Sequence, residues 1–138
     1  MVFLTDELRR RQAKEQRGRC FYCHLQLRED MTWEHLVPRA HGGDNRMANM
    51  RVSHQKCNAE CVGALPISWK LALHDIGRDF GSDAFFLLSM RAQCMARAGT
   101  LPRMVKAKRP KRPAIRIHRE NVELLVSYLP EEMLLLAA

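Results

Sequence analysis

The sequence predicts an α+β fold, in which a small strand–loop–strand–helix unit is extended by helices at both ends. Two observations predict the small unit. Two pairs of cysteine or histidine residues bracket a short stretch, and segments rich in β-forming residues lie between the pairs. Helical spacing of apolar residues outside this stretch predicts the additional helices. We expect two parts, residues 1–62 with the small unit and a basic N-terminal helix, and residues 63–138 with a helical and basic extension.

The bracketing pairs have the spacing of metal ligands. Cys20 and Cys23 form a Cys-x-x-Cys pair, and His54 and Cys57 form a His-x-x-Cys pair. Two such pairs can hold one zinc ion in a tetrahedron of sulfur and nitrogen ligands. Because so small a unit buries little apolar surface, we expect the ion to stabilise it, with on the order of 10–16 kcal/mol of apparent binding energy.

The cysteine count supports metal binding. The chain contains five cysteines, an odd number, and its N-terminus lacks the layout of a secretion signal. Both features argue against a disulfide framework and predict a cytoplasmic protein. Cys61 and His24 adjoin the two pairs and are alternative zinc ligands. Cys94 lies in an apolar helical pattern, so we expect its side chain to be buried.

The charge of the chain favours a polyanionic partner. Its 138 residues carry a formal net charge of +8 at pH 7, and such a field attracts phosphate backbones or acidic membrane surfaces. Apolar residues make up 46% of the chain, which is ordinary for a globular protein. No apolar run approaches the roughly 20 residues that cross a bilayer, so we expect no membrane segment.

Local signals predict the elements of the first part. Thr5 can cap a helix over residues 5–17, which has acidic residues in its first turn and a basic run after them. Segments rich in β-forming residues predict strands over residues 31–37 and 49–54. A short helix is expected to begin near Gln55.

The second part is predicted to be helical. Pro66 stands at the start of an expected helix that runs to about Ile76. Ser82 is the expected cap of a helix over residues 83–98, and a last helix is expected over residues 120–128. Residues 97–119 hold no acidic residue, and three prolines are expected to keep this basic stretch extended. These prolines are Pro102, Pro110 and Pro113.

Four polar residues between and beside the pairs indicate chemistry on a phosphodiester. Glu34 and His35 are neighbours, and Asn49 and Asn58 follow them along the chain. An imidazole titrates near neutral pH and can accept a proton from water. Carboxylate and amide oxygens are ligands for hard cations such as Mg²⁺ or Mn²⁺. Such a cation can neutralise the charge that develops when water attacks phosphorus.

Taken together, residues 20–58 resemble the HNH endonuclease family, whose fold is a small ββα-metal core held together by zinc. The elements that carry the resemblance fall in the family's order: Cys20-Phe21-Tyr22-Cys23, Glu34-His35-Leu36-Val37-Pro38, Gly42-Gly43, Asn49 and His54-Gln55-Lys56-Cys57-Asn58. Two positions differ from many relatives. His54 stands where cysteine is frequent, and Glu34 stands where aspartate is common.

The resemblance implies a role for each of these residues. His35 would be the general base, and Asn49 would hydrogen-bond across the loop to hold His35 in place. Glu34 and Asn58 would hold the catalytic cation. Because the position of Asn58 is often histidine in the family, an amide oxygen there favours a hard cation, Mg²⁺ or Mn²⁺. The structural zinc would be held by Cys20, Cys23, His54 and Cys57.

The implied function is that of a metal-dependent endonuclease or nickase acting on double-stranded DNA. The basic residues expected to contact the phosphate backbone are Arg39, Arg51, Lys56, Lys106, Lys108, Arg109, Lys111 and Arg112. The alternative is a zinc-stabilised nucleic-acid-binding protein without catalytic activity, or a subunit of a larger phage or defence complex. RNA as the substrate and a homodimer stay open.

Overall fold

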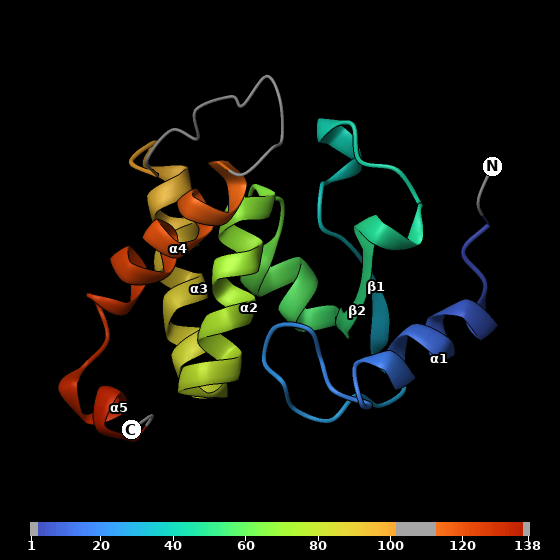
Figure 1. Cartoon of the computed structure of the whole chain (residues 1–138), viewed down its shortest axis with the longest axis horizontal. Helices are drawn as coiled ribbons and strands as arrows, with labels where there is room; N and C mark the ends of the chain where they lie inside the picture. The colour runs from blue at the N-terminus through green and yellow to red at the C-terminus, as the bar shows by residue number, and fades with distance from the viewer. Residues whose placement is uncertain (1–2, 102–112, 137–138) are drawn as a thin grey trace.

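The computed structural model describes residues 3–101 and 113–136. Its main elements form two groups (Figure 1). The first group contains α1 (Asp6–Glu15) and the strands β1 (Met31–His35) and β2 (Met50–His54). The second contains α2 (Ile67–Phe80), α3 (Ser82–Arg97) and α4 (Pro113–Val126), and a short α5 (Glu131–Leu136) follows. Within the described ranges, no helix is both long enough and apolar enough to cross a bilayer.

The two predicted strands are present, and they form an antiparallel sheet. Met31 pairs with His54 and His35 pairs with Met50, so the strands coincide over their whole length. The connection between them contains two short 3-10 turns, η1 (Arg39–His41) and η2 (Met47–Asn49). The sheet therefore places His35 at the end that leads into this loop.

Helix α1 is attached to the sheet by one glutamine. As predicted, the hydroxyl of Thr5 caps the helix by accepting a hydrogen bond from the Leu8 amide at 3.1 Å. Just after the helix, the Gln16 side chain donates to the Val52 carbonyl at 2.7 Å and accepts from the Val52 amide at 2.8 Å. Gln16 thus bonds both backbone groups of Val52, on the edge of β2 that faces away from β1, where buried polar groups require partners. The Phe21 amide donates to the same carbonyl at 3.1 Å.

The short helix after β2 starts where the sequence predicts it, but it is wider than an α-helix. Element η3 (Cys57–Val62) is a π-helix, and the Gly63 amide closes it by donating to the Asn58 carbonyl at 2.6 Å. This geometry puts Cys57 and Asn58 in the first turn, directly after the second strand.

Helix α2 packs against the turn that contains Cys20 and Cys23. The close approach requires a glycine, because a Cβ atom at Gly77 would lie 1.9 Å from the Tyr22 carbonyl oxygen. One turn earlier, the His74 ring stacks on Phe21 with centroids 4.0 Å apart, and its Nδ1 bonds the Phe21 carbonyl at 2.5 Å. The helical extension therefore supports the predicted metal site directly.

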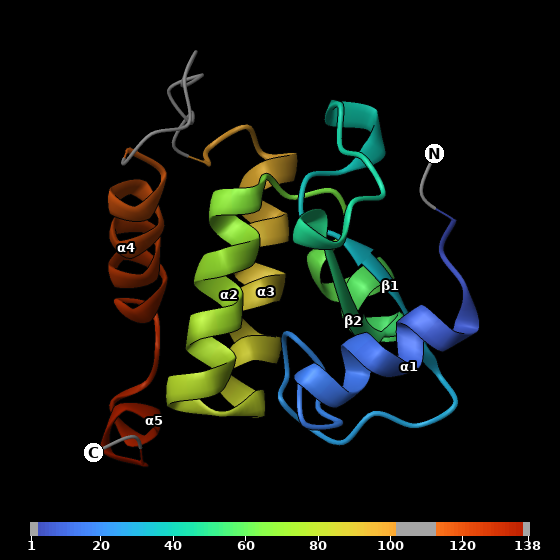
Figure 2. The same ribbon diagram turned by 45° about the vertical axis from the view of Figure 1, so that its right-hand side comes forward.

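One apolar core runs through both groups of elements. Tyr22 from the first group is fully buried and stacks on Phe85 of α3, with centroids 5.8 Å apart. The same cluster contains Leu36, Trp69 and Leu125. Figure 2 shows α2, α3 and α4 standing side by side next to the sheet and α1. The apolar core crosses residue 62 without a break. The predicted division into two parts at this residue stays a prediction.

Two expectations about helix starts were wrong. The last long helix begins at Pro113, not near residue 120, and Pro113 is helical instead of extended. Proline suits the first turn of a helix because the amide that it lacks has no partner there. Helix α3 begins at Ser82 itself, and Gly81, with φ of 95°, is the cap residue.

The expectation that Cys94 is buried was also wrong, because its side chain is exposed. Helix α3 buries the face that carries Phe85, Leu88 and Ala92, which follow the spacing of one helical stripe. Cys94 lies off this stripe. An apolar helix alone does not tell which side meets the core.

Candidate active site

Four donor atoms form a compact group at one end of the sheet. The ligand atoms of Cys20, Cys23, His54 and Cys57 all lie within 4.8 Å of one another. His54 presents Nδ1 to the group, at 3.3 Å from the Cys23 sulfur and 3.8 Å from the Cys57 sulfur. Three thiolates and one imidazole are a preferred set for tetrahedral zinc. The predicted pairs therefore come together in a site that is able to hold zinc.

Groups around this cluster orient its donors. The other ring nitrogen of His54, Nε2, bonds the Gln26 carbonyl at 2.8 Å, which assigns the proton to Nε2 and leaves Nδ1 as a metal donor. The amides of Tyr22 and Leu25 point at the sulfurs of Cys20 and Cys23, at 3.4 and 3.5 Å. Such N–H groups favour negatively charged sulfur.

The pKa values of the three cysteines in the cluster depend on one another. Hydrogen bonds from Cys23 and Cys57 lower the pKa of Cys20. The shared hydrogen bond with Cys20 in turn raises the pKa of Cys23 to about 11, and that of Cys57 is raised as well. Without a cation, ionisation of Cys20 therefore opposes ionisation of Cys23 and Cys57. A bound Zn²⁺ would reverse this, because it binds cysteine as the thiolate.

The two alternative zinc ligands lie outside the cluster. The His24 ring bonds the His74 carbonyl at 2.9 Å and so belongs to the packing of α2. Cys61 is buried in η3, where burial raises the pKa of its thiol. Neither side chain belongs to the group of four donors found among the described residues.

At the other end of the sheet, the His35 ring is held by a residue that sequence reasoning missed. His35 Nε2 lies 2.8 Å from Asn45 Oδ1. Since an amide oxygen can only accept, this contact assigns the proton to Nε2 and leaves Nδ1 with a free lone pair. His35 is half-buried. Asn45 follows the Gly42-Gly43-Asp44 stretch, and its place in this loop was its only sequence signal.

Asn49 acts on the backbone of the same loop. Its Oδ1 accepts from the Val37 amide at 2.7 Å, and its Nδ2 donates to the carbonyls of Val37 and Asp44 at 3.2 and 2.9 Å. Asn49 thus joins the two sides of the loop, through Val37 two residues after His35 and through Asp44 next to Asn45. Its effect on His35 runs through the backbone, without a direct contact to the ring.

Glu34 points into the protein. Its side chain and that of Lys70 from α2 are each 2% exposed, and Lys70 Nζ lies 2.6 Å from Glu34 Oε1. Neighbouring residues of a strand point to opposite faces of the sheet, so the Glu34 carboxylate and the His35 ring do not share a face. Burial raises the pKa of Glu34, and the Lys70 ammonium opposes this shift.

Asn58 contacts the backbone of β1 just before Glu34. Its Nδ2 donates to the Trp33 carbonyl at 3.0 Å, which links the first turn of η3 to β1. The structure thus brings Asn58 to the residue before Glu34. The predicted roles of Glu34 and Asn58 as cation ligands stay predictions.

The predicted phosphate contacts differ in their surroundings. Arg39 and Lys56 are exposed. The Arg51 guanidinium lies over the Phe21 ring, 5.6 Å from its centroid, and donates to the Met50 carbonyl at 2.7 Å. The other five, Lys106, Lys108, Arg109, Lys111 and Arg112, lie outside the described residues.

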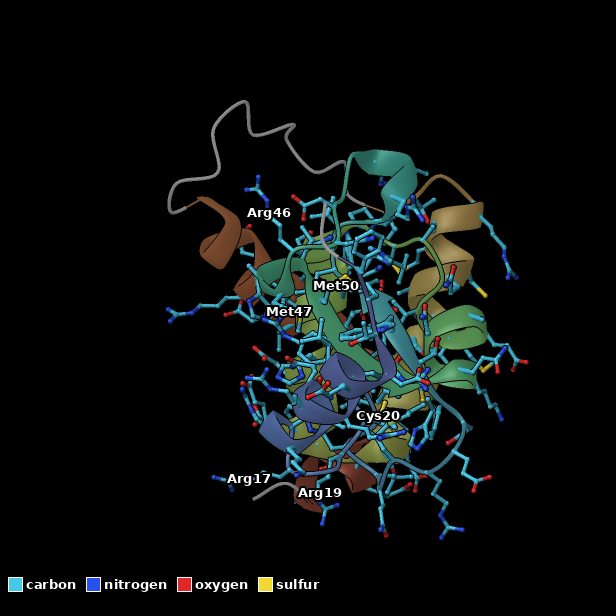
Figure 3. All side chains as sticks on the ribbon, turned by 90° about the vertical axis from the view of Figure 1, so that its right-hand side faces the viewer. Arg17, Arg19, Cys20, Arg46, Met47 and Met50 are labelled. Carbon is cyan, nitrogen blue, oxygen red and sulfur yellow. The ribbon has the colours of Figure 1, made fainter. Side chains whose placement is uncertain are left out.

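A basic cavity of about 590 Å³ lies between α1, the Cys20–Cys23 turn and α2. Arg11, Arg19 and Arg51 contribute to its lining, together with Glu15. Figure 3 shows this side of the molecule, with Arg17 and Arg19 near one end and Arg46 beyond Met47 near the other. Positive charge therefore extends along the face that α1 and the loop share.

Comparison with known proteins supports the interpretation of the first part of the chain. Residues 20–60 match the family model described as HNH endonuclease. Among curated proteins, none matches this chain. The matched segment covers the four-donor group, both strands, the His35 loop and the start of η3. Residues 20–60 are therefore an HNH domain, with the mixed helix and two-stranded sheet of a ββα-metal core.

Proposed function

We propose that this protein is an HNH endonuclease or nickase that hydrolyses phosphodiester bonds in DNA, with His35 as the general base. The observation that carries the proposal is the hydrogen bond from His35 Nε2 to Asn45 at 2.8 Å. This hydrogen bond holds the His35 ring at the start of the loop and leaves Nδ1 as the proton acceptor. Nδ1 would take a proton from a water molecule as that water attacks phosphorus.

The charges of the chain support DNA as the substrate. The net charge of +8 favours a polyanion, and Arg39, in the loop that follows His35, is exposed. Arginine and lysine side chains on the face that α1 shares with this loop would bind the backbone phosphates and set the position of the duplex. Zinc at the four-donor group would be structural, since all four positions of the tetrahedron are taken by protein ligands.

A divalent cation fits Glu34 and Asn58 only in part, because Lys70 already pairs with Glu34 Oε1 and the carboxylate points away from the face of the His35 ring. Glu34 Oε2 is buried and has no hydrogen-bond partner among the described residues, so one carboxylate oxygen is left for a cation. Glu34 and Asn58 would hold Mg²⁺ or Mn²⁺, which prefer such oxygen ligands. When bound, the cation supplies positive charge for the phosphate and the leaving oxygen.

Replacing the proposed base tests this function. We expect His35→Ala to abolish nicking of supercoiled plasmid in Mg²⁺, because alanine lacks the imidazole nitrogen that would accept the proton from water. Zinc content, circular dichroism and DNA binding should match those of the wild type. His41→Ala is the matched control, since His41 is an exposed histidine of the same loop, and it should nick normally. Wild-type nicking by His35→Ala would remove His35 as the base.

A further inference from the structure

A lysine from outside the HNH domain occupies the carboxylate that the cation would use. Lys70 belongs to α2, and its ammonium lies 2.6 Å from Glu34 Oε1. The same ammonium donates to the His35 carbonyl oxygen, also at 2.6 Å. Lys70 and Glu34 are each 1% exposed as whole residues. The contact is therefore shielded from solvent and tied to the strand that carries His35.

Burial makes this ion pair persistent. Removing two charges from water is costly, and each partner is stable in its charged form mainly because the other is close. Breaking the pair without a replacement would leave a buried charge uncompensated. Any group that takes Glu34 from Lys70 must therefore bring its own positive charge.

A divalent cation and the Lys70 ammonium would compete for this carboxylate. The charge of Glu34 is already neutralised by Lys70, and Asn58 offers only a neutral oxygen. A cation on Glu34 Oε2 would lie close to the ammonium on Oε1 of the same carboxylate, and like charges at this separation repel strongly in a buried site. The orphaned Oε2 alone does not offset this repulsion.

We propose that the Lys70 ammonium is the resident cation at Glu34 in the free protein, and that a divalent cation coordinates Glu34 only when Lys70 is displaced from it. The inference rests on the proposed function for the role of the divalent cation. Bound DNA would favour the exchange, because a phosphate adds the negative charge that the neutral Glu34–Lys70 pair lacks. Metal binding and DNA binding are then coupled through Lys70.

Mn²⁺ binding to zinc-loaded full-length protein without DNA tests this competition. The variant is Lys70→Gln, which removes the charge and keeps a hydrogen-bond donor for Glu34. We expect it to bind Mn²⁺ at least about tenfold more tightly than the wild type, because the repulsion at Glu34 is gone. Electron paramagnetic resonance of free Mn²⁺ gives the affinity. Lys14→Gln removes the same charge from an exposed position on α1 and should bind Mn²⁺ like the wild type.

The double variant Glu34→Gln with Lys70→Gln shows where the additional Mn²⁺ of Lys70→Gln binds. It should lose the gain, which shows that the added Mn²⁺ sits on Glu34. Equal Mn²⁺ affinity in Lys70→Gln and the wild type would overturn the proposal. A gain that survives in the double variant would overturn it as well.

The single variant Glu34→Gln keeps the proposal testable if Lys70→Gln does not fold. In the free protein Glu34 is held by Lys70, so Glu34→Gln should bind Mn²⁺ as weakly as the wild type. Tight Mn²⁺ binding by the wild type that Glu34→Gln abolishes would contradict the proposal.

These measurements do not depend on cleavage. Absence of nicking together with the gain in Lys70→Gln would remove the proposed function and leave the competition standing. Normal nicking with unchanged Mn²⁺ binding in Lys70→Gln would remove the competition and leave the proposed function standing.

Discussion

At the scale of single residues, the proposed chemistry depends on how one imidazole is held. The His35 ring has a side-chain partner in Asn45, 2.8 Å from Nε2. Asn49 holds the backbone on both sides of the same loop. Asn45 sets the tautomer and orientation of the ring, and Asn49 fixes the loop that carries Asn45, which a general base needs before substrate arrives.

Asn45→Ala should slow cleavage without weakening substrate binding. We expect kcat for plasmid nicking to fall by about 10- to 100-fold, because a general base that moves out of line loses efficiency. KM should change little, since Asn45 is not proposed to bind DNA. Steady-state nicking rates against plasmid concentration measure both constants.

Asn45→Asp is the conservative partner of this variant. It keeps an acceptor oxygen for His35 Nε2, so it should retain most of the wild-type kcat. A kcat as low as that of Asn45→Ala would mean that the hydrogen bond is not what matters at this position.

At the scale of elements, the four-donor group joins three short pieces of chain. The Cys20–Cys23 turn, the end of β2 and the first turn of η3 all supply donors. Each piece is too short to bury much apolar surface, although α2 packs on the turn through Gly77 and His74. An ion that links the three pieces would therefore hold the sheet and η3 in register.

Cys57→Ser should abolish stoichiometric zinc binding and destabilise the protein. Loss of a thiolate ligand removes much of a binding energy on the order of 10–16 kcal/mol, so we expect thermal unfolding at a clearly lower temperature. Inductively coupled plasma measurements give the zinc content, and circular dichroism gives the unfolding temperature. The wild type treated with a strong chelator should behave in the same way.

Cys94→Ser provides the control for this experiment. Cys94 is exposed on α3 and lies outside the four-donor group. It should keep one zinc ion per chain and the wild-type unfolding temperature. Full zinc occupancy in Cys57→Ser would show that the ion, if bound, uses other ligands.

At the scale of the whole molecule, the helical extension and the HNH domain share one apolar core. Tyr22 and Leu36 belong to the same cluster as Trp69, Phe85 and Leu125. The extension is therefore more than an attached arm, since it supplies both packing for the metal site and the buried Lys70. Substitutions in α2 are therefore expected to change the active site through these contacts.

The net charge of +8 makes a prediction about DNA binding as a whole. Affinity for duplex DNA should fall steeply with salt, by roughly 100-fold between about 50 and about 200 mM, because each phosphate contact releases counterions. Gel-shift titrations at several salt concentrations measure the slope. Binding that is indifferent to salt would contradict a backbone-dominated interface.

Much of the fold could be predicted because its signals are local. Ligand spacing identified the four donors, Thr5 identified the start of α1, and β-forming residues located both strands to within two residues. The start of α4 was missed because proline breaks a helix in its interior but suits its first turn. The exposure of Cys94 was missed because the helix pattern alone does not show which stripe meets the core.

The sequence by itself determined the ligand pairs, the paired strands and the presence of a histidine beside a carboxylate, since these depend on neighbours within a few residues. Only the tertiary structure decided what those side chains touch. Asn45 reaches His35 across a folded loop, and Lys70 reaches Glu34 from 36 positions away along the chain. Such contacts depend on how helices and sheet pack, and packing is set by the whole core at once.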